Sequence, residues 1–256
     1  MKIILCGCNG KMGKYITQVA KNSKNIEIVA GIDKNNSENE NFPVFTSLDK
    51  VNLNADILID FSHPSALDGI LEYCSKKEIP AVICTTGFSS LQIEKIKEYS
   101  KEIALFYSQN MSLGINLLIN LTKKATEFLG TDFNIEIIEK HHNQKIDSPS
   151  GTALMIANEI SECLPDKPLC IFDRSKSRAP RSKNEIGIHS IRAGNICGDH
   201  EVIFAGENEI ITISHHAQSR NIFAEGAIKA AEFLMFKSPG LYTMQDMVEC
   251  HQSLKI

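Results

Sequence analysis

The sequence lacks the features expected of a membrane, secreted or zinc-binding protein. It has no apolar run near the roughly 20 residues that a helix needs to cross a bilayer. It opens directly on an apolar strand, Lys2–Cys6, without the plan of a signal peptide. Its eight cysteines form no Cys-x-x-Cys pair, which argues against zinc and disulfides and favours reduced thiols. We therefore expect a cytoplasmic protein with no membrane partner and no metal.

An excess of charge of one sign is also absent. The chain has 31 acidic and 27 basic residues, for a net charge of -4. Such a balance does not favour binding to nucleic acid, which requires a basic surface. What the sequence does contain is 256 residues, 43% of them hydrophobic, enough for one or two globular domains.

Strands and helices alternate in the first half of the chain. Short apolar runs predict strands, with helices over 12–22, 65–77 and 90–101, and the strands are Lys2–Cys6, Ile26–Ile32, Asp56–Phe61, Ala81–Cys84 and Ala104–Tyr107. A polar loop is expected over Lys34–Asn41. Repeated strand–helix–strand units predict a parallel sheet covered by helices on both faces.

The pattern changes after Asn110. A long amphipathic helix is predicted over Leu113–Leu129, and strands then dominate, at 134–140, 188–192, 201–204 and 209–215. A last helix over Ile222–Phe236 is expected to return to the first domain. The sequence thus predicts an α/β protein in which residues 1–112 and 223–256 form a Rossmann-type dinucleotide-binding domain. Residues 113–222 form a smaller α+β domain with a mixed sheet.

A glycine loop follows the first strand, in the pattern Gly7-x-x-Gly10-x-x-Gly13. Glycines at such a turn let backbone N–H groups approach a pyrophosphate, and the helix behind them offers a partial positive charge. Asp33 lies about 20 residues further on, at the end of the second strand, where a carboxylate binds ribose hydroxyls. Asp33 favours NADH, but Lys34 beside it is placed to pair with the 2′-phosphate of NADPH, so both cofactors remain open.

The most unusual stretch runs from His141 to Thr152, between a predicted strand and a predicted helix. It holds two histidines, a lysine, an aspartate and a Ser-Gly-Thr turn within twelve residues. Loops have few packing duties, so such groups are free to converge on a ligand. By itself the stretch is also compatible with a solvated polar loop.

Six segments in this order resemble the dihydrodipicolinate reductase (4-hydroxy-tetrahydrodipicolinate reductase) family over nearly the whole chain. They are Gly7-x-x-Gly10-x-Met12-Gly13, Thr85-Thr86-Gly87-Phe88, Asn110-Met111-Ser112-Leu113-Gly114-Ile115-Asn116, Glu139-x-His141-His142-x-x-Lys145-x-Asp147-x-Pro149-Ser150-Gly151-Thr152-Ala153, Ile191-Arg192-Ala193-Gly194 and His200-Glu201-Val202. The resemblance implies reduction of 4-hydroxy-tetrahydrodipicolinate to tetrahydrodipicolinate, a dicarboxylate, in lysine and diaminopimelate biosynthesis. It also implies NADH or NADPH as cofactor and a homotetramer built through the second domain.

The resemblance assigns roles to individual residues. His141 is the implied acid/base, and Lys145 is the implied proton donor or electrostatic partner. The implied substrate-binding residues are His142, Gly151 and Thr152. The implied cofactor-binding residues are Gly7, Cys8, Asn9, Gly10, Lys11, Met12, Asp33, Lys34, Cys84, Thr85, Thr86, Ser108, Gln109, Asn110 and Met111. Cys84 departs from the glycine usual in this family, and its thiol is expected to add bulk near the nicotinamide.

Elementary chemistry agrees with these roles. Hydride addition moves charge toward the ring nitrogen of the substrate, and a histidine with an ordinary pKa near 6.5 is suited to answer with a proton. Lys145 is expected to stabilise the developing charge, and the start of a helix at Ser150–Thr152 is suited to bind a carboxylate.

Three other classes compete with this interpretation. A metal hydrolase is disfavoured because the histidines do not have metal-ligand spacing and neighbours on a strand face opposite ways. A non-catalytic NAD(P) sensor would not need His141 and Lys145 beside a helix start. A different Rossmann oxidoreductase would fit the first domain equally well, and only the stretch from His141 to Thr152 distinguishes it.

Overall fold

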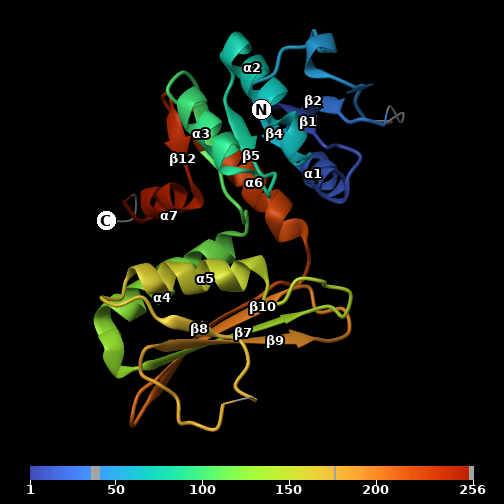
Figure 1. The fold of residues 1–256 in the computed structure, drawn as a ribbon. Helices are drawn as coiled ribbons and strands as arrows, with labels where there is room; N and C mark the ends of the chain where they lie inside the picture. Colours follow the sequence, from blue (N-terminus) through green and yellow to red (C-terminus); the bar gives the residue numbers. More distant parts are fainter. Residues whose placement is uncertain (36–40, 176, 254–256) are drawn as a thin grey trace. The chain divides into compact units, whose positions relative to one another are not determined.

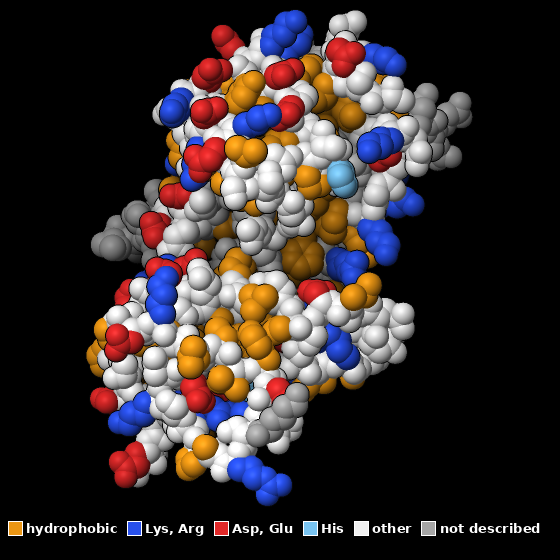
Figure 2. All heavy atoms as spheres, in the orientation of Figure 1, with side chains coloured by type: hydrophobic (Ala, Val, Ile, Leu, Met, Phe, Trp, Pro, Cys, Tyr) orange, Lys and Arg blue, Asp and Glu red, His pale blue; other side chains and the backbone are white. Residues whose placement is uncertain are grey.

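A computed structural model of the protein describes residues 1–35, 41–175 and 177–253. Residues 36–40 of the loop expected over Lys34–Asn41 lie outside the described residues. The chain divides into two compact units, Met1–Leu113 with Arg220–Ile256, and Gly114–Ser219. No described helix is long and apolar enough to span a membrane. Figure 2 shows basic and acidic side chains interspersed on the visible face of both units.

The first unit is built on a seven-stranded parallel sheet (Figure 1). In spatial order its strands are β12 (Gly240–Tyr242), β6 (Ala104–Tyr107), β5 (Ala81–Ile83), β4 (Ile57–Asp60), β1 (Lys2–Cys6), β2 (Glu27–Ile32) and β3 (Val44–Phe45). From β1 the chain builds outward through β2 to β3, and then returns to place β4 on the other side of β1. In open α/β sheets ligands bind at such a reversal, beyond the carboxyl ends of the strands.

Helices cover both faces of this sheet, which explains why its strands are apolar except at their ends, where Lys2, Glu27 and Asp60 lie. On β1, Ile3 and Leu5 face a core shared with α1 (Lys11–Lys21), α6 (Asn221–Leu234) and α7 (Met244–Ser253). The alternate residues Ile4 and Cys6 face a second core shared with α2 (Leu67–Lys77) and α3 (Ser90–Tyr99). Short 3-10 helices, Leu48–Lys50 and Pro64–Ala66, lie in the connections.

The second unit is a five-stranded mixed sheet with helices on one face. Its spatial order is β11 (Ile210–His216), β10 (Asp199–Ala205), β7 (Asn134–His141), β9 (Glu185–Arg192) and β8 (Leu169–Ile171). β7 runs parallel to β9 and antiparallel to β10. The core lies between the sheet and the helices α4 (Leu113–Leu129) and α5 (Gly151–Glu162), and a 3-10 turn follows α4 at Gly130–Asp132. Every second residue of the central strands faces away from that core.

The structure confirms the predicted α/β class, with a parallel Rossmann-like sheet and a second, mixed sheet. The predicted helices and strands are present, most within a few residues of the expected ends. Among the strands and α-helices, four were not predicted from the sequence: the short strands β3, β8 and β12, and helix α7.

Candidate functional site

The glycine loop joins β1 to α1 and requires glycine for steric reasons. Gly7 has a φ of +75°, and a Cβ there would lie 2.3 Å from the carbonyl oxygen of Phe61. A Cβ on Gly13 would lie 2.4 Å from the carbonyl oxygens of Gly7 and Cys8, so α1 packs directly on the loop. Gly10 is the N-cap of α1 and has no side chain to bind the first amides of the helix. The loop therefore leaves its backbone accessible to a ligand phosphate.

Asp33 is tied to this loop by its carboxylate. One oxygen accepts a hydrogen bond from the backbone N–H of Asn9 at 3.1 Å, and the other accepts one from Asn35 at 3.2 Å. The Asn9 side chain in turn donates to the carbonyl of Asn35 at 2.9 Å. These bonds hold the acid beside the glycine loop, where the sequence predicts a ribose-binding carboxylate.

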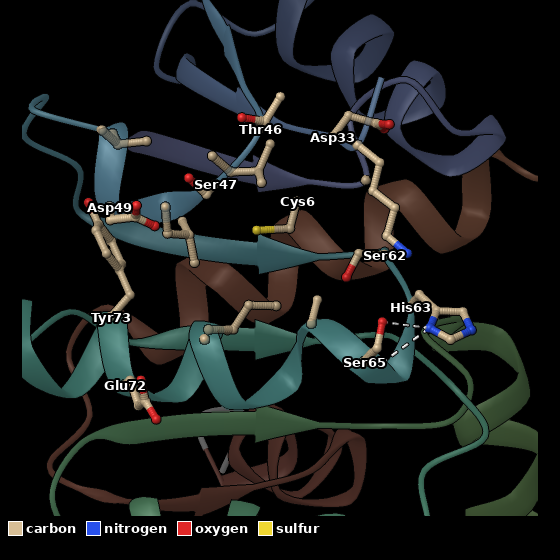
Figure 3. Close-up of a pocket in the computed structure, with 18 of the residues that line it drawn as sticks. Cys6, Asp33, Thr46, Ser47, Asp49, Ser62, His63, Ser65, Glu72 and Tyr73 are labelled. Carbon is tan, nitrogen blue, oxygen red and sulfur yellow. Dashed lines mark hydrogen bonds between the residues drawn. The ribbon is translucent and has the colours of Figure 1, made fainter. Parts of the chain in front are cut away.

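A cavity of about 1000 Å³ opens at this edge of the first unit. Of the predicted cofactor residues, Gly7, Gly10, Asp33 and Lys34 line it. Further lining comes from connections that sequence reasoning did not assign, including Thr46, Ser47, Ser62, His63, Ser65, Tyr73, Lys76 and Lys77. Figure 3 shows Asp33, Ser62 and His63 at one end of the cavity and Asp49 and Tyr73 at the other. The cavity and its glycine rim fit a nucleotide.

The imidazole of His63 is fixed at the cavity wall. Its Nδ1 accepts the backbone N–H of Ser65 at 3.2 Å, and it lies 3.0 Å from the Ser65 hydroxyl (Figure 3). Because Nδ1 is the acceptor, the neutral ring carries its proton on Nε2. Ser62 and His63 lie two and three residues after the end of β4, so the rule that ligands gather at strand ends would have found them.

The other predicted cofactor residues lie in the loops after β5 and β6. Thr85 is buried and Thr86 is exposed. The Ser108 hydroxyl donates to the carbonyl of Asn110 at 2.9 Å, which makes this loop a tight turn. Met111 is buried in the core of the first unit, while Gln109 is exposed. None of these residues lines the cavity described above.

Cys84 follows β5 and is buried. Its thiol is buried in the core cluster that also holds Val82, and it contributes nothing to the cavity wall. Burial raises the pKa of this thiol well above its usual value. The extra bulk relative to glycine is therefore accommodated by the core of the sheet.

A buried charge cluster occupies the end of β7 in the second unit. Glu139 and His141 are two residues apart on this strand, so their side chains share the core-facing side. Nδ1 of His141 lies 2.6 Å from Oε2 of Glu139. Arg192, the register partner of His141 on β9, donates to both Glu139 oxygens at 2.7 and 2.8 Å. The backbone N–H of Ser150 adds a fourth hydrogen bond at 3.1 Å.

These donors decide the ionisation of Glu139. Burial alone would raise the pKa of its carboxyl, but hydrogen bonds from Arg192, Ser190 and His141 lower it to about 2. Glu139 is fully buried, and it is an anion at any physiological pH. For His141, burial lowers the pKa, and the neighbouring Glu139 anion offsets part of that effect.

His200 completes the cluster from β10. Its ring meets that of His141 edge to face, with centroids 5.3 Å apart. Its Nε2 lies 3.2 Å from the hydroxyl of Ser150, which also caps α5 by accepting the N–H of Ala153 at 3.2 Å. Burial lowers the pKa of His200 to about 4. His200 is therefore a neutral ring that fixes the start of α5.

The loop from His142 to Ser150 holds Lys145 close to this cluster. Lys145 donates to the carboxylate of Asp147 at 2.8 Å, and the hydrogen bond from Lys145 lowers the pKa of that carboxyl. Arg192 donates to the carbonyl of Asp147 at 2.6 Å. The sequence motif assigns no role to Asp147, and the structure makes its carboxylate the partner of Lys145.

The predicted substrate-binding residues surround the same loop. His142 follows the end of β7 and is half-buried. Gly151 is exposed, and Thr152 is half-buried in the first turn of α5. The structure thus gathers a buried histidine, a lysine and a helix start within one unit. Chemically, the group offers a proton-transfer ring, a cation and backbone donors for an anion.

Two family models match the chain, "Dihydrodipicolinate reductase, N-terminus" over residues 1–111 and "Dihydrodipicolinate reductase, C-terminus" over residues 114–248. The chain belongs to the dihydrodipicolinate reductase family. Two relatives named 4-hydroxy-tetrahydrodipicolinate reductase, from Caldanaerobacter subterraneus subsp. tengcongensis and Clostridium novyi, are 51% and 50% identical to it. Each match covers 97% of this chain and 98% of the relative.

A solved dihydrodipicolinate reductase from Paenisporosarcina sp. TG-14, with dipicolinate bound, has the same fold. It is 25% identical, with a TM-score of 0.80 over 95% of this chain and 97% of its own. Membership of the dihydrodipicolinate reductase family decides between the competing classes. A metal hydrolase and a cofactor sensor are both set aside.

Three residues of the buried cluster lie in the family motifs but have no role predicted from the sequence. They are Glu139, Arg192 and His200. Glu139 could have been found from its spacing, because a residue two before His141 on a strand shares its face. Arg192 and His200 reach the cluster only through the pairing of β7 with β9 and β10, which the sequence does not reveal.

Proposed function

We propose that this chain reduces 4-hydroxy-tetrahydrodipicolinate to tetrahydrodipicolinate with NADH or NADPH, in lysine and diaminopimelate biosynthesis. The observation that carries the proposal is the cluster of His141, Lys145 and the α5 start, in a chain so similar to named reductases over nearly its full length. The dipicolinate in a solved relative is an aromatic dicarboxylate. It supports a cyclic dicarboxylate as the substrate class.

The first unit would hold the cofactor. Gly7, Gly10, Asp33 and Lys34 fit a dinucleotide, since they line one cavity and the Gly7 backbone leaves no room for a side chain. Cys8, Asn9, Lys11 and Met12 continue this loop, and the loops of Thr85–Thr86 and Ser108–Met111 lie at other strand ends of the same sheet. The cofactor, when bound, supplies a hydride.

The second unit would bind and protonate the substrate. The amides of Gly151 and Thr152 at the start of α5 bind one carboxylate, with His142 as a further contact. Lys145 supplies a positive charge for the other carboxylate or for charge that develops on the ring. His141 exchanges a proton with the ring nitrogen. The negative charges of the substrate favour the protonated form of His141 and oppose the lowering of its pKa by burial.

His141→Gln tests this assignment. We expect kcat to fall by about 100-fold or more, the usual range for a general acid–base group, while binding of NADH is unchanged. The assay supplies the product of dihydrodipicolinate synthase together with NADH or NADPH and follows loss of the nicotinamide absorbance. His189→Gln, on the opposite face of the sheet, is the matched control, and sedimentation checks that this variant keeps the oligomeric state of wild type, since that face is proposed to contact other copies. Near-full kcat in His141→Gln would remove this residue from the mechanism.

The open face of the five-stranded sheet supports a homotetramer. Isoleucines stand on this face where a monomer would expose them to water: Ile138, Ile191, Ile203 and Ile210. Ile191 is 43% and Ile210 is 69% exposed, and apolar surface of this kind favours association. Sedimentation of the intact chain tests this, and a monomer at assay concentration would contradict it. The eight free cysteines support a cytoplasmic location.

A further inference from the structure

We infer that Glu139 is a positioning residue: held by Arg192 and the Ser150 amide, it binds Nδ1 of His141 and so reserves Nε2 for exchange with the substrate. The inference rests on the proposed role of His141. It adds what that role does not contain, namely which nitrogen reacts and what orients the ring.

The hydrogen bonds of Glu139 leave little freedom for its carboxylate. Oε2 lies between Nδ1 of His141 at 2.6 Å and one nitrogen of the Arg192 fork at 2.8 Å. Oε1 lies between the other nitrogen of the fork at 2.7 Å and the N–H of Ser150 at 3.1 Å. Because these four hydrogen bonds and a further one from Ser190 surround a fully buried group, the carboxylate has one orientation.

This arrangement determines the tautomer of His141. An ionised carboxylate can only accept hydrogen bonds, so the nitrogen that faces it must carry a proton. Nδ1 is therefore the N–H of the neutral ring, and Nε2 carries the lone pair. On the Nε2 side the neighbour is Gly198, where a Cβ would lie only 3.1 Å from that nitrogen. The absence of a side chain at Gly198 leaves Nε2 unobstructed on that side.

The charges around His141 come from four elements. Glu139 on β7 favours the imidazolium, whereas Arg192 on β9 and Lys145 in the loop oppose it. His200 on β10 is neutral over the working range. Glu139 is the one group of these four that stabilises the protonated ring. Its charge therefore keeps the pKa of His141 from falling further. Loss of its charge lowers the pKa of His141, and loss of the Arg192 charge raises it.

The same strand offers a matched control in Glu136. Its carboxylate also binds an arginine and a histidine, with Nε of Arg181 at 2.9 Å and Nε2 of His189 at 2.8 Å. It belongs to the other face of the sheet, away from Lys145 and α5; because that face is the proposed contact between copies, the oligomeric state of Glu136→Gln is compared with that of wild type by sedimentation. If a glutamate bound to one arginine and one histidine serves only the fold, then Glu136→Gln and Glu139→Gln should change kcat and the His141 titration to a similar extent.

The experiment combines proton NMR of ¹⁵N-histidine-labelled full-length protein with pH profiles of kcat and KM. The His141 signals are assigned by their loss in His141→Gln. In wild type the neutral ring should show Nδ1 protonated and Nε2 unprotonated. In Glu139→Gln we expect the His141 titration and the matching limb of the kcat profile to move to lower pH. We also expect kcat to fall on the order of 100-fold, as for a misplaced catalytic group, with KM for NADH unchanged.

The remaining variants separate positioning from folding. Glu139→Asp keeps the negative charge but has a shorter side chain. Compared with Glu139→Gln, it should bring the His141 titration closer to wild type than it brings kcat. Arg192→Gln should move the His141 titration to higher pH. If Glu139→Gln does not fold, this shift tests the inference in its place, and no shift would contradict it. An unchanged titration and tautomer in Glu139→Gln, or equal changes in Glu136→Gln, would overturn the inference. Full kcat in His141→Gln would refute the proposed role of His141 but leave the NMR result standing.

Discussion

Folding of the second unit should depend on pH through His200. This ring is 4% exposed and its pKa is lowered by burial from 6.5 to about 4. The folded protein therefore binds a proton less readily than the unfolded chain. Unfolding takes up a proton between pH 6.5 and pH 4, so acid favours the unfolded state in this window. Above pH 6.5 both states are neutral and the effect vanishes.

The size of this effect follows from the two pKa values. A full difference between 6.5 and about 4 corresponds to about 3 kcal/mol, of which about 2 to 3 kcal/mol is lost between pH 7 and pH 4.5. Glu139 contributes little in this range. Its pKa is lowered to about 2, so the stability that it adds is present above pH 4.5 and is lost only as the pH falls toward 2.

The assay is urea-induced unfolding of the full chain, followed by circular dichroism because the protein has no tryptophan. His200→Gln keeps a polar group near Ser150 and removes the titration. The free energy of unfolding of wild type should fall by about 2 to 3 kcal/mol more than that of the variant between pH 7 and pH 4.5. His189→Gln, whose side chain is 47% exposed, should retain the wild-type slope. Identical slopes for wild type and His200→Gln would refute the argument.

Two further predictions concern the first unit. Asp33→Ala should raise KM for NADH more than for NADPH, because the carboxylate accepts ribose hydroxyls and repels a 2′-phosphate; equal increases for both cofactors in the reductase assay would count against it. Gly7→Ala should lower the melting temperature and weaken NADH binding far more than Gly87→Ala. Both glycines have positive φ, but only at Gly7 does a Cβ meet backbone, whereas Gly87 has nothing within 4 Å. Strain alone costs about 1–2 kcal/mol at such a site, and equal melting temperatures for the two variants would exclude the clash.

The sequence predicts the long and periodic elements of this fold well, and it misses the short ones for a physical reason. A strand such as β1 shows an apolar run because it is buried on both faces. β3 has two residues and β12 has three, too few for a period to appear. Their pairing is set by neighbours distant in sequence. Among the described side chains of α7 (Met244–Ser253), Met244 and Met247 are the two buried in the core, which gives this helix a weak pattern.

The candidate site divides in the same way. The positions of Gly7, Gly10 and Asp33 in the site can be predicted from the sequence, because their roles depend on local backbone geometry and on spacing along one strand–helix–strand unit. The parts of the cavity wall at Thr46–Ser47 and Lys76–Lys77 cannot be predicted from the sequence. They belong to connections that only the order of strands in the sheet brings together. Arg192 is equally hidden, because its contact with Glu139 spans 53 residues of sequence.

The Glu139–Arg192 pair is difficult to explain by stability alone. It lies at the edge of a core that includes Ile137, Ile188 and Val202. Removing two charges from water costs several kcal/mol per ion, and their attraction often does no better than an apolar pair of similar volume would. A fold selected only for stability would gain little from this choice. A site that must present one nitrogen of His141 gains a fixed acceptor that remains ionised at every working pH, and the guanidinium fork is what holds that acceptor in place.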